Sequence, residues 1–453
     1  MKRIIIFITV FICSPTVFGQ LWQSVNANYL NPQQIRVIYG DSVKDELIVG
    51  YNNNSYTSPF NHLAIYRNGN WDSMSCGTWG NPLAICRYKE DIIIGGAFQI
   101  LGNGDTVNHI VSWDGVSYTK LLKGVYGPVY DLLVHNDTLY VFGAFDSVDG
   151  TLASKIACWD GTSWSAFDTT KWYVNGIYSG VFYNGELYIA GNFRKYDNSI
   201  INIAKWNGNT WVDIGNGQMH SSGSWWINDL AVYNNELYAG GYFTMNSGAP
   251  GNYIAKWDST NWSNVGSGFD DGQVWSLHVF NSELYIGGAF NHFNGIQSNI
   301  IAKWDGSKLC SFAGNITGGG INTMTALNNE LYIGGLFLGI NNDTTMSFIT
   351  KWIGGNHVDS CYPQISNIFE FDKENSISFY PNPIRDIIEI NLEEVDQELQ
   401  IYDIQGKLVM SEKLEYSPGS TKMKVDLSRL LPGIYLLKII NTKQVKQAKI
   451  VKI

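Results

Sequence analysis

The residues with the clearest capacity to contact a ligand are aromatic and acidic side chains that occur once, between segments that otherwise repeat. They are Trp172, Tyr173, Trp225, Trp226, Asp270 and Asp271. Exposed aromatic rings can stack on sugars, and carboxylates can accept hydroxyl hydrogen bonds or supply oxygen ligands to calcium. The spacing of the aspartates fits no complete calcium loop. We therefore predict ligand binding without a metal. The alternative is that Trp225 and Trp226 only begin an inner strand and cover the core.

The sequence carries no recognisable catalytic motif. Its seven histidines show no HExxH spacing or close pairing, no GxSxG or phosphate-binding loop occurs, and the cysteines form no CxxC pair. We therefore predict no catalytic residue, no metal and no cofactor. Two carboxylates for glycoside cleavage could still converge from distant segments, so an enzyme stays open as an alternative.

The composition excludes several classes of protein. Of the 453 residues, 15% are charged and 14% are aromatic, which favours half-buried strands over long, charged surface helices. The formal net charge is −10. A nucleic-acid partner requires a basic face, so this charge disfavours one.

An internal repeat governs most of the chain and must position these side chains. Its marker is a segment such as ELYIGGAF, whose third residue lies at 48, 93, 140, 188, 238, 285 and 332 in successive copies. A second marker, of the type IAKWDG, recurs with the same period. Apolar and polar residues alternate within each copy, and turn residues interrupt them at regular places. Each of the seven copies is therefore predicted to form four short antiparallel strands.

The connections within a copy are predicted to be tight hairpins. Asn184-Gly185 joins a first strand to a second, and Asp114-Gly115 joins a third to a fourth; these residues tolerate positive φ. Asp258-Ser259 departs from this pattern and predicts a less regular turn. Because both hairpins of a copy lie on one face, the longer loops and crossovers share the other face, where ligand contact is expected.

The two ends of the repeat array predict ring closure. No fourth strand follows Trp352, whereas Leu21–Val25 matches the WxxV pattern of the fourth strands. The N-terminal strand is thus expected to complete the seventh unit, which removes exposed sheet edges. Radial repetition of four-stranded units predicts an all-β fold with a seven-bladed β-propeller over residues 20–352.

The glycine pairs that end the second strands and the later tryptophans, as in Gly287-Gly288 and Trp304, make this region similar to propellers of the kelch and galactose-oxidase type. The third-strand KWDG differs from the usual kelch pattern. The resemblance implies architecture and no particular chemistry.

A second module follows residues 353–376, which carry no repeat marker and are predicted to be a linker. Alternating apolar positions over residues 377–453 predict a small Ig-like β-sandwich. The ordered motifs YPNP, IYDIQGK and VDLSRLLPGIYLLKI resemble the type A C-terminal sorting domain of the type IX secretion system. The matching residues are Tyr380, Pro381, Asn382, Pro383, Asp403, Gly406, Lys407, Leu427, Gly433 and Tyr435. The resemblance implies the type IX secretion machinery as a partner; the alternative is a purely stabilising Ig-like domain.

The N-terminus predicts export. Lys2 and Arg3 precede an apolar run and small residues that end at Gly19, the arrangement of a secretory signal peptide over residues 1–19. The alternative is a lipoprotein acylated at Cys13. The apolar run is shorter than the roughly 20 residues of a spanning helix, so no transmembrane segment is expected in the mature chain.

The five cysteines after the signal peptide leave their pairing open. Cys76 with Cys86, and Cys310 with Cys361, could form disulfides in an oxidising compartment. Small buried thiols are the alternative.

These features predict a protein that is secreted, or displayed on the outer cell surface, after passage through the periplasm. We expect it to bind carbohydrate or protein through the long-loop face of the propeller. The alternatives are a secreted carbohydrate-active enzyme with a site on that face, and a structural surface protein without a small ligand.

Overall fold

The computed structural model describes residues 22–30, 32–52, 62–168, 172–214, 225–244, 252–312, 314–354, 361–362, 379–380, 386–391, 397–402, 408–414, 422–430, 433–440 and 445–452. The signal-peptide prediction, over residues 1–19, lies outside this set. The described residues form an all-β fold, with two short 3₁₀ turns, η1 (Ala27–Leu30) and η2 (Thr344–Met346). The chain divides into two compact units, Met1–Tyr362 and Pro363–Ile453.

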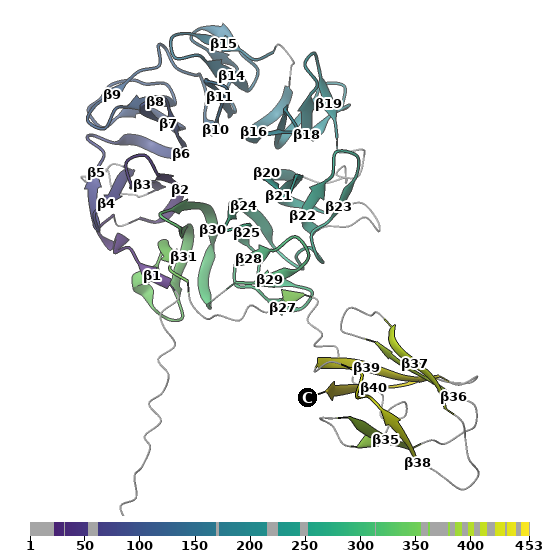
Figure 1. The fold of residues 1–453 in the computed structure, drawn as a ribbon. Coiled ribbons are helices and arrows are strands. Elements are labelled where there is room, and N and C mark those ends of the chain that lie inside the picture. The colour runs from purple at the N-terminus through teal and green to yellow at the C-terminus, as the bar shows by residue number, and fades with distance from the viewer. Residues whose placement is uncertain are drawn as a thin grey trace, which may run out of the picture. The chain divides into compact units, whose positions relative to one another are not determined.

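Seven sheets of at least four strands make up the described part of the first unit, one for each copy of the repeat (Figure 1). The first three are β2 (Gln34–Asp41), β3 (Glu46–Asn52), β4 (Leu63–Arg67) and β5 (Asn70–Ser73); β6 (Thr78–Tyr88), β7 (Asp91–Leu101), β8 (Ile110–Trp113) and β9 (Tyr118–Thr119); and β10 (Val129–His135), β11 (Thr138–Gly143), β14 (Ile156–Trp159) and β15 (Trp164–Ala166). The fourth and fifth are β16 (Trp172–Tyr183), β17 (Glu186–Lys195), β18 (Ile201–Trp206) and β19 (Trp211–Asp213); and β20 (Trp226–Tyr233), β21 (Glu236–Thr244), β22 (Asn252–Trp257) and β23 (Trp262–Asn264).

The sixth and seventh sheets each include a strand from outside their own repeat. The sixth is β24 (Gln273–Phe280), β25 (Glu283–Ala289), β28 (Ile301–Trp304), β29 (Leu309–Ser311) and β33 (Cys361–Tyr362), and the seventh is β30 (Ile316–Leu327), β31 (Glu330–Ile340), β32 (Ile349–Trp352) and β1 (Trp22–Ser24). Two small hairpins project from the sheets: β12 (Ser147–Val148) with β13 (Thr151–Leu152), and β26 (His292–Phe293) with β27 (Ile296–Gln297).

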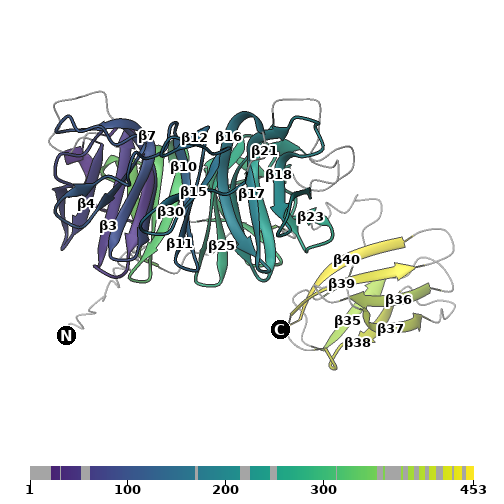
Figure 2. The same ribbon diagram turned by 90° about the horizontal axis from the view of Figure 1, so that it is seen from above.

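The first strands of neighbouring sheets contact one another in a closed cycle, in the order β2, β6, β10, β16, β20, β24, β30 and back to β2. They line the inside of the ring in Figure 1, and the edge-on view in Figure 2 shows the strands running between its two faces. The cycle closes where Thr323 Oγ1 accepts a hydrogen bond from Ile38 N (3.2 Å) and Thr325 Oγ1 accepts one from Gly40 N (3.1 Å).

The outer edge of the seventh sheet is completed by the N-terminal strand, as the WxxV pattern predicts. β1 pairs antiparallel with β32, with Trp22 opposite Trp352. The Trp22 ring is 5.3 Å from the Trp352 ring and 5.7 Å from that of Phe312. Trp22 thereby fastens the strand to the core of the seventh sheet.

Tight hairpins occur where the turn residues predict them. Asn184 (φ 50°) and Gly185 (φ 79°) take the left-handed conformation that such turns require. The prediction of a less regular turn at Asp258-Ser259 is wrong. Ser259 adopts a φ of 85°, and Asp258 Oδ1 accepts hydrogen bonds from Thr260 N and Asn261 N, the pattern seen in the Asp-Gly turns.

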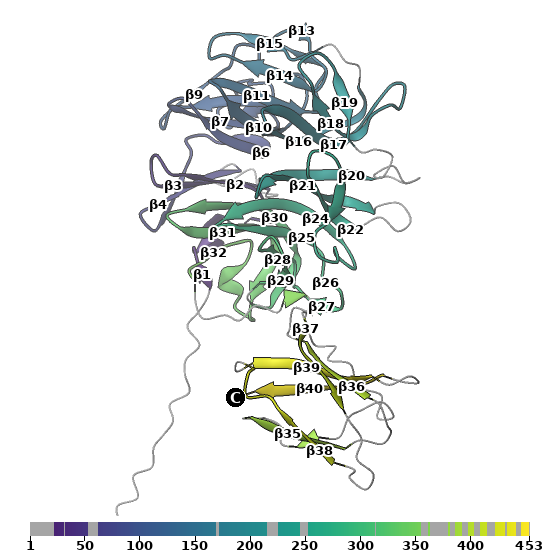
Figure 3. The ribbon, with the colours of Figure 1, turned by 45° about the vertical axis from the view of Figure 1, so that its right-hand side comes forward.

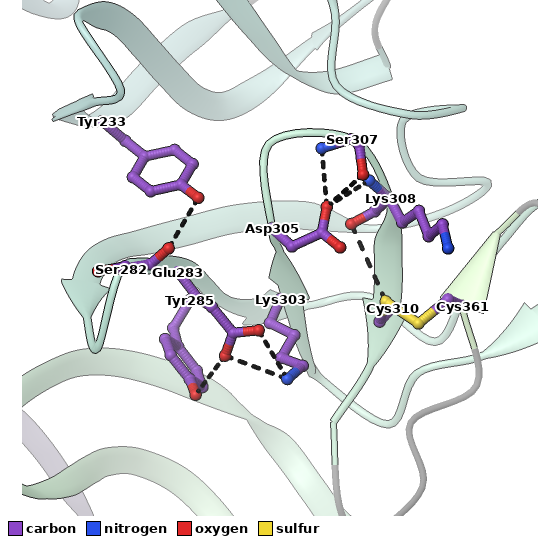
Figure 4. Close-up of polar contacts among 10 residues, drawn as sticks. All are labelled: Tyr233, Ser282, Glu283, Tyr285, Lys303, Asp305, Ser307, Lys308, Cys310 and Cys361. Carbon is purple, nitrogen blue, oxygen red and sulfur yellow. Dashed lines mark hydrogen bonds and ion pairs between the residues drawn. A yellow bond between two sulfur atoms is a disulfide. The ribbon is translucent and has the colours of Figure 1, made fainter.

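A disulfide fixes the end of the first unit. Cys310 of β29 and Cys361 of β33 are bonded, so the chain that leaves the seventh sheet returns to the outer edge of the sixth (Figure 4). The other bridge considered, Cys76 with Cys86, does not form, and Cys86 and Cys158 carry thiols.

The second unit contains two sheets, visible in Figure 3. They are β34 (Phe379–Tyr380), β35 (Ile387–Asn391) and β38 (Lys422–Asp426); and β37 (Leu408–Leu414), β36 (Gln397–Tyr402), β39 (Gly433–Ile440) and β40 (Val445–Lys452). Alternate apolar residues from both sheets form one buried core, which includes Ile388, Leu399, Val425, Leu437 and Ile450.

Candidate functional site

One face of the ring carries a backbone feature that recurs in all seven described sheets. The residue before, or at the start of, each third strand has a φ between 61° and 70°. These residues are His62, His109, Lys155, Asn202, Tyr253, Ile300 and Phe348. Two backbone hydrogen bonds hold the conformation at His109, from its N to Phe98 O (2.8 Å) and from Gly96 N to its carbonyl oxygen (3.0 Å). Strained backbone held in this way is common at ligand sites. The conformation repeats while the side chain varies, so this face can differ chemically from sheet to sheet.

The fifth sheet carries an aromatic cluster on this face. It consists of Trp225, Trp226, Tyr242 and Tyr253. The Tyr242 ring stacks with Trp225 at 5.3 Å, and its centroid lies 5.1 Å from Trp226 and 6.1 Å from Tyr253. Trp225 and Trp226 lie at the start of the first strand, Tyr242 at the end of the second and Tyr253 at the start of the third. Two of the residues predicted from the sequence are thus brought together with two that were not.

The cluster does not repeat in the other sheets. Trp226 pairs with Tyr242 across β20 and β21. The equivalent pairs are Asn81 with Ala97 in the second sheet and Gln273 with Ala289 in the sixth. Packing of the ring therefore does not require aromatic residues at these positions.

The cluster is held in place by a hydrogen bond to its backbone and is partly exposed to solvent. Asn202 Nδ2 donates a hydrogen bond to the carbonyl oxygen of Trp225 (2.9 Å), which fixes the strand entry. Tyr242 is 37% exposed, and both tryptophans are half-buried. Aromatic rings that are held in place and open to solvent on one side suit stacking against an apolar or sugar face.

The other predicted aromatic pair is placed differently. Trp172 is buried, 7% exposed, with its ring 4.9 Å from Phe193 and 5.9 Å from Trp211. It belongs to the core between the strands and presents no open ring. Tyr173 pairs with Arg194 in the sheet register, and its side chain lies outside the described residues.

The predicted acidic pair holds the small hairpin β26–β27. The Asp270 carboxylate accepts hydrogen bonds from Asn294 N (2.9 Å) and Gly295 N (2.7 Å), and Asp271 Oδ1 accepts one from Asn291 N (2.6 Å). Burial acts to raise the pKa of Asp271, but the hydrogen bonds from Asn291 and His292 outweigh it, so the pKa is lowered. The carboxylate oxygens of Asp270 and Asp271 therefore accept hydrogen bonds that stabilise the local fold, and these oxygens are not free to bind a ligand.

Two further carboxylates, which the sequence did not single out, lie on inner strands. Asp131 Oδ2 accepts a hydrogen bond from Gly180 N (2.9 Å) in the fourth sheet, and Asp229 Oδ2 accepts one from Leu277 N (2.8 Å) in the sixth. Burial raises the pKa of Asp131 to about 6. Burial also raises the pKa of Asp229 to about 7, and the charge of Asp131 adds to that shift. Both groups tie neighbouring sheets together.

These raised pKa values predict a pH dependence of stability. In an unfolded chain both carboxyls titrate near pH 3.9. The folded chain therefore retains protons that the unfolded chain has released, and the stabilisation is complete below about pH 4 and is lost as the pH rises through about 6 to 7. We expect Asp229→Asn, which cannot ionise, to lose less stability than the wild type between about pH 5 and pH 8. Chemical denaturation at each pH measures the difference.

Asp114→Asn is the matched control for this experiment. Hydrogen bonds from Ser117 and Val116 lower the pKa of Asp114, so it stays ionised in both states over that range. The Asp114→Asn variant should follow the pH dependence of the wild type. Equal slopes for Asp229→Asn and the wild type would contradict the assignment.

Within the described ranges, no group of three or more His, Cys, Asp or Glu side chains could hold a metal ion. The same ranges contain no helix long and apolar enough to cross a membrane.

Residues 378–453 match the family model described as the secretion system C-terminal sorting domain. This sorting domain implies the type IX secretion machinery and export, either into the medium or to the cell surface. Of the motif residues, Tyr380 lies in β34, Leu427 is buried in the core, and Gly433 and Tyr435 lie in β39. The others are outside the described residues: Pro381, Asn382, Pro383, Asp403, Gly406 and Lys407.

Solved structures give only distant similarities. PorZ, a surface component of the type IX secretion system of Porphyromonas gingivalis, is 11% identical over 92% of this chain and 81% of its own, with a TM-score of 0.17. An exo-β-1,3-galactanase from Phanerochaete chrysosporium is 10% identical over 91% and 93%, with a TM-score of 0.28. An α-L-arabinofuranosidase from Clostridium thermocellum is 15% identical over 45% and 79%, with a TM-score of 0.25. At these values the similarities support no argument about function. A search of curated proteins found no match.

Proposed function

We propose that this chain is an exported carbohydrate-binding protein, secreted or displayed on the cell surface, that holds its ligand against the aromatic cluster of the fifth sheet. Its ligand-binding part is a seven-bladed, kelch-like β-propeller over residues 20–352. The segment expected to be a linker, residues 353–376, contains Cys361–Tyr362 of the sixth sheet, so the connection to an Ig-like sorting domain over residues 377–453 begins after Tyr362. The signal peptide over residues 1–19 is removed.

The aromatic cluster is the observation that carries this proposal. The rings of Trp226 and Tyr242 occupy positions that hold Asn, Gln or Ala in the second and sixth sheets, so these two rings are dispensable for the scaffold. The sorting domain supports the location, since surface and extracellular proteins meet polysaccharides. Binding is favoured over catalysis because the carboxylates considered, Asp131, Asp229, Asp270 and Asp271, all accept backbone hydrogen bonds.

Tyr242→Ala tests the proposal with little risk to the fold, because alanine stands at the equivalent positions Ala97 and Ala289. A glycan array with the purified wild-type chain selects a ligand, and titration calorimetry measures its Kd. We expect the variant to raise the Kd by about tenfold or more, because the central ring of the stack is lost.

Tyr126→Ala is the matched control, since Tyr126 is an exposed tyrosine in a crossover outside the cluster. It should leave the Kd unchanged. An unchanged Kd in Tyr242→Ala would contradict the proposed site. Capture of a protein with no glycan bound would favour a protein ligand, and turnover of a polysaccharide would favour the enzyme.

A further inference from the structure

A cavity of about 700 Å³ opens between the first two sheets, on the same face as the aromatic cluster. Its walls come from the end of β3, the start of β6, the end of β7 and the residues before β4 and β8. Small-molecule sites have volumes of about 300 to 1,000 Å³, so the cavity can hold a short oligosaccharide. Its walls belong to the first and second sheets, whereas the aromatic cluster belongs to the fifth.

The polar side chains among the described lining residues are carboxamides and imidazoles. Asn52, Asn81 and Gln99 supply carboxamides, each able to donate and accept hydrogen bonds. No Asp, Glu, Lys or Arg is among the described lining residues. Such a surface matches hydroxyl groups, which also donate and accept, and gives no counterion to a charged ligand.

Two histidines complete the polar wall. His62 Nδ1 is 3.0 Å from Tyr51 O, and His109 Nδ1 is 3.2 Å from Gly96 O. Burial lowers the pKa of both imidazoles, so they are neutral at pH 7. A neutral ring that donates from Nδ1 to a carbonyl has Nε2 as an acceptor. His109 Nε2 lies 3.4 Å from Gln99 Nε2, which orients that carboxamide.

Trp79 provides the apolar surface of the cavity. It pairs with Ile100 where β6 and β7 extend beyond the usual hairpin, and it is 51% exposed. An indole held on a strand and open to solvent has little packing reason to be there. An indole ring can stack on the apolar C–H face of a pyranose, while neighbouring carboxamides and imidazoles form hydrogen bonds with its hydroxyl groups.

We propose that this cavity is a second saccharide site, which selects short neutral oligosaccharides by stacking on Trp79 and by hydrogen bonds to Asn52, Asn81, Gln99 and the His62 imidazole. It is independent of the aromatic cluster, because no residue is shared. The chain then presents two separate saccharide sites on one face of the ring.

The test uses the full mature chain and titration calorimetry with neutral cello-, xylo-, manno- and malto-oligosaccharides, and with oligogalacturonate as the charged counterpart. In the Tyr242→Ala background, where the aromatic cluster is impaired, we expect at least one neutral oligosaccharide still to bind. Adding Trp79→Ala should raise that Kd by about tenfold or more, and adding Gln99→Ala should raise it to a lesser extent. Adding Tyr126→Ala, the control, should leave it unchanged.

The outcomes separate this site from the proposed function. Loss of all binding in Tyr242→Ala alone overturns the cavity site and leaves the aromatic cluster standing. If Trp79→Ala alone loses oligosaccharide binding while Tyr242→Ala binds as the wild type does, the result supports the cavity site and contradicts the site at the aromatic cluster. Preference of the cavity for oligogalacturonate, or neutral binding that is indifferent to Trp79→Ala, overturns the inference.

Discussion

Replacing Trp22 with alanine is expected to lower the free energy of unfolding by about 3 to 5 kcal/mol, the range for burying and then removing a large aromatic side chain. Trp22 is 1% exposed and packs against Phe312 and Trp352. β1 pairs over only three residues, so its side-chain anchor contributes much of its hold on the seventh sheet. The loss of unfolding free energy should therefore exceed that of a typical core truncation in an inner strand, because the ring of seven sheets also loses the strand that closes it. Urea denaturation followed by far-ultraviolet circular dichroism measures the change.

Gln23→Ala is the control on the same strand. Gln23 is exposed, and its contact with Thr350 uses the backbone carbonyl, which the substitution keeps. We expect a change of less than about 0.5 kcal/mol. If Trp22→Ala were as mild as Gln23→Ala, closure would have to rest on the inner-strand contacts of Thr323 and Thr325 instead.

The sheets and the closing strand could be predicted because each is determined by short sequence patterns within the repeat. Turn residues with positive φ, alternating strands and the WxxV match each occur within a few residues, so the pairing of Trp22 with Trp352 follows from counting strands. The Asp258-Ser259 turn was misjudged because the prediction considered only the residue that follows the aspartate. The aspartate side chain, through its bonds to Thr260 and Asn261, sets that turn more than the residue after it does.

The candidate site was only partly predictable, because exposure depends on register. Trp172 and Trp226 look alike in the sequence as aromatic starts of inner strands. Trp226 pairs with Tyr242, whereas Trp172 pairs with Lys195 beyond two register shifts and turns into the core. Tyr242 was missed because it lies in the repeated marker. The signal that could have found it is that ELYAGGYF carries tyrosine where the other GG-containing markers carry alanine or leucine.

Contacts distant in sequence account for the remaining misses. The oxygens of Asp270 are occupied by Asn294 and Gly295, which no local pattern links to it. His62 and His109 were noted only as lacking metal spacing. Their equivalence, each with positive φ before a third strand, becomes visible once the sheets are aligned.

Deleting residues 377–453 is expected to abolish surface delivery and to leave the remaining chain in the periplasm. The matched region, residues 378–453, is the sorting domain, and the disulfide and strand pairings described for the first unit lie before it, between residues 22 and 362. The truncated chain should therefore still fold and cross the inner membrane by the signal peptide predicted over residues 1–19, but lack the element that the type IX machinery reads. Protease treatment of intact cells, with fractionation and immunoblotting, distinguishes surface from periplasmic protein.

Three controls decide between loss of sorting and loss of folding. Tyr242→Ala in the full chain should reach the surface in wild-type amounts, since it changes one exposed ring of the first unit. Residues 377–453 fused to an unrelated periplasmic protein should carry that protein to the surface. Because the Cys310–Cys361 bond closes the first unit, its presence in the periplasmic truncation, tested by thiol alkylation, shows that the trapped chain is folded. A truncation that is folded and still reaches the surface would place the sorting information before residue 377, in the ring itself.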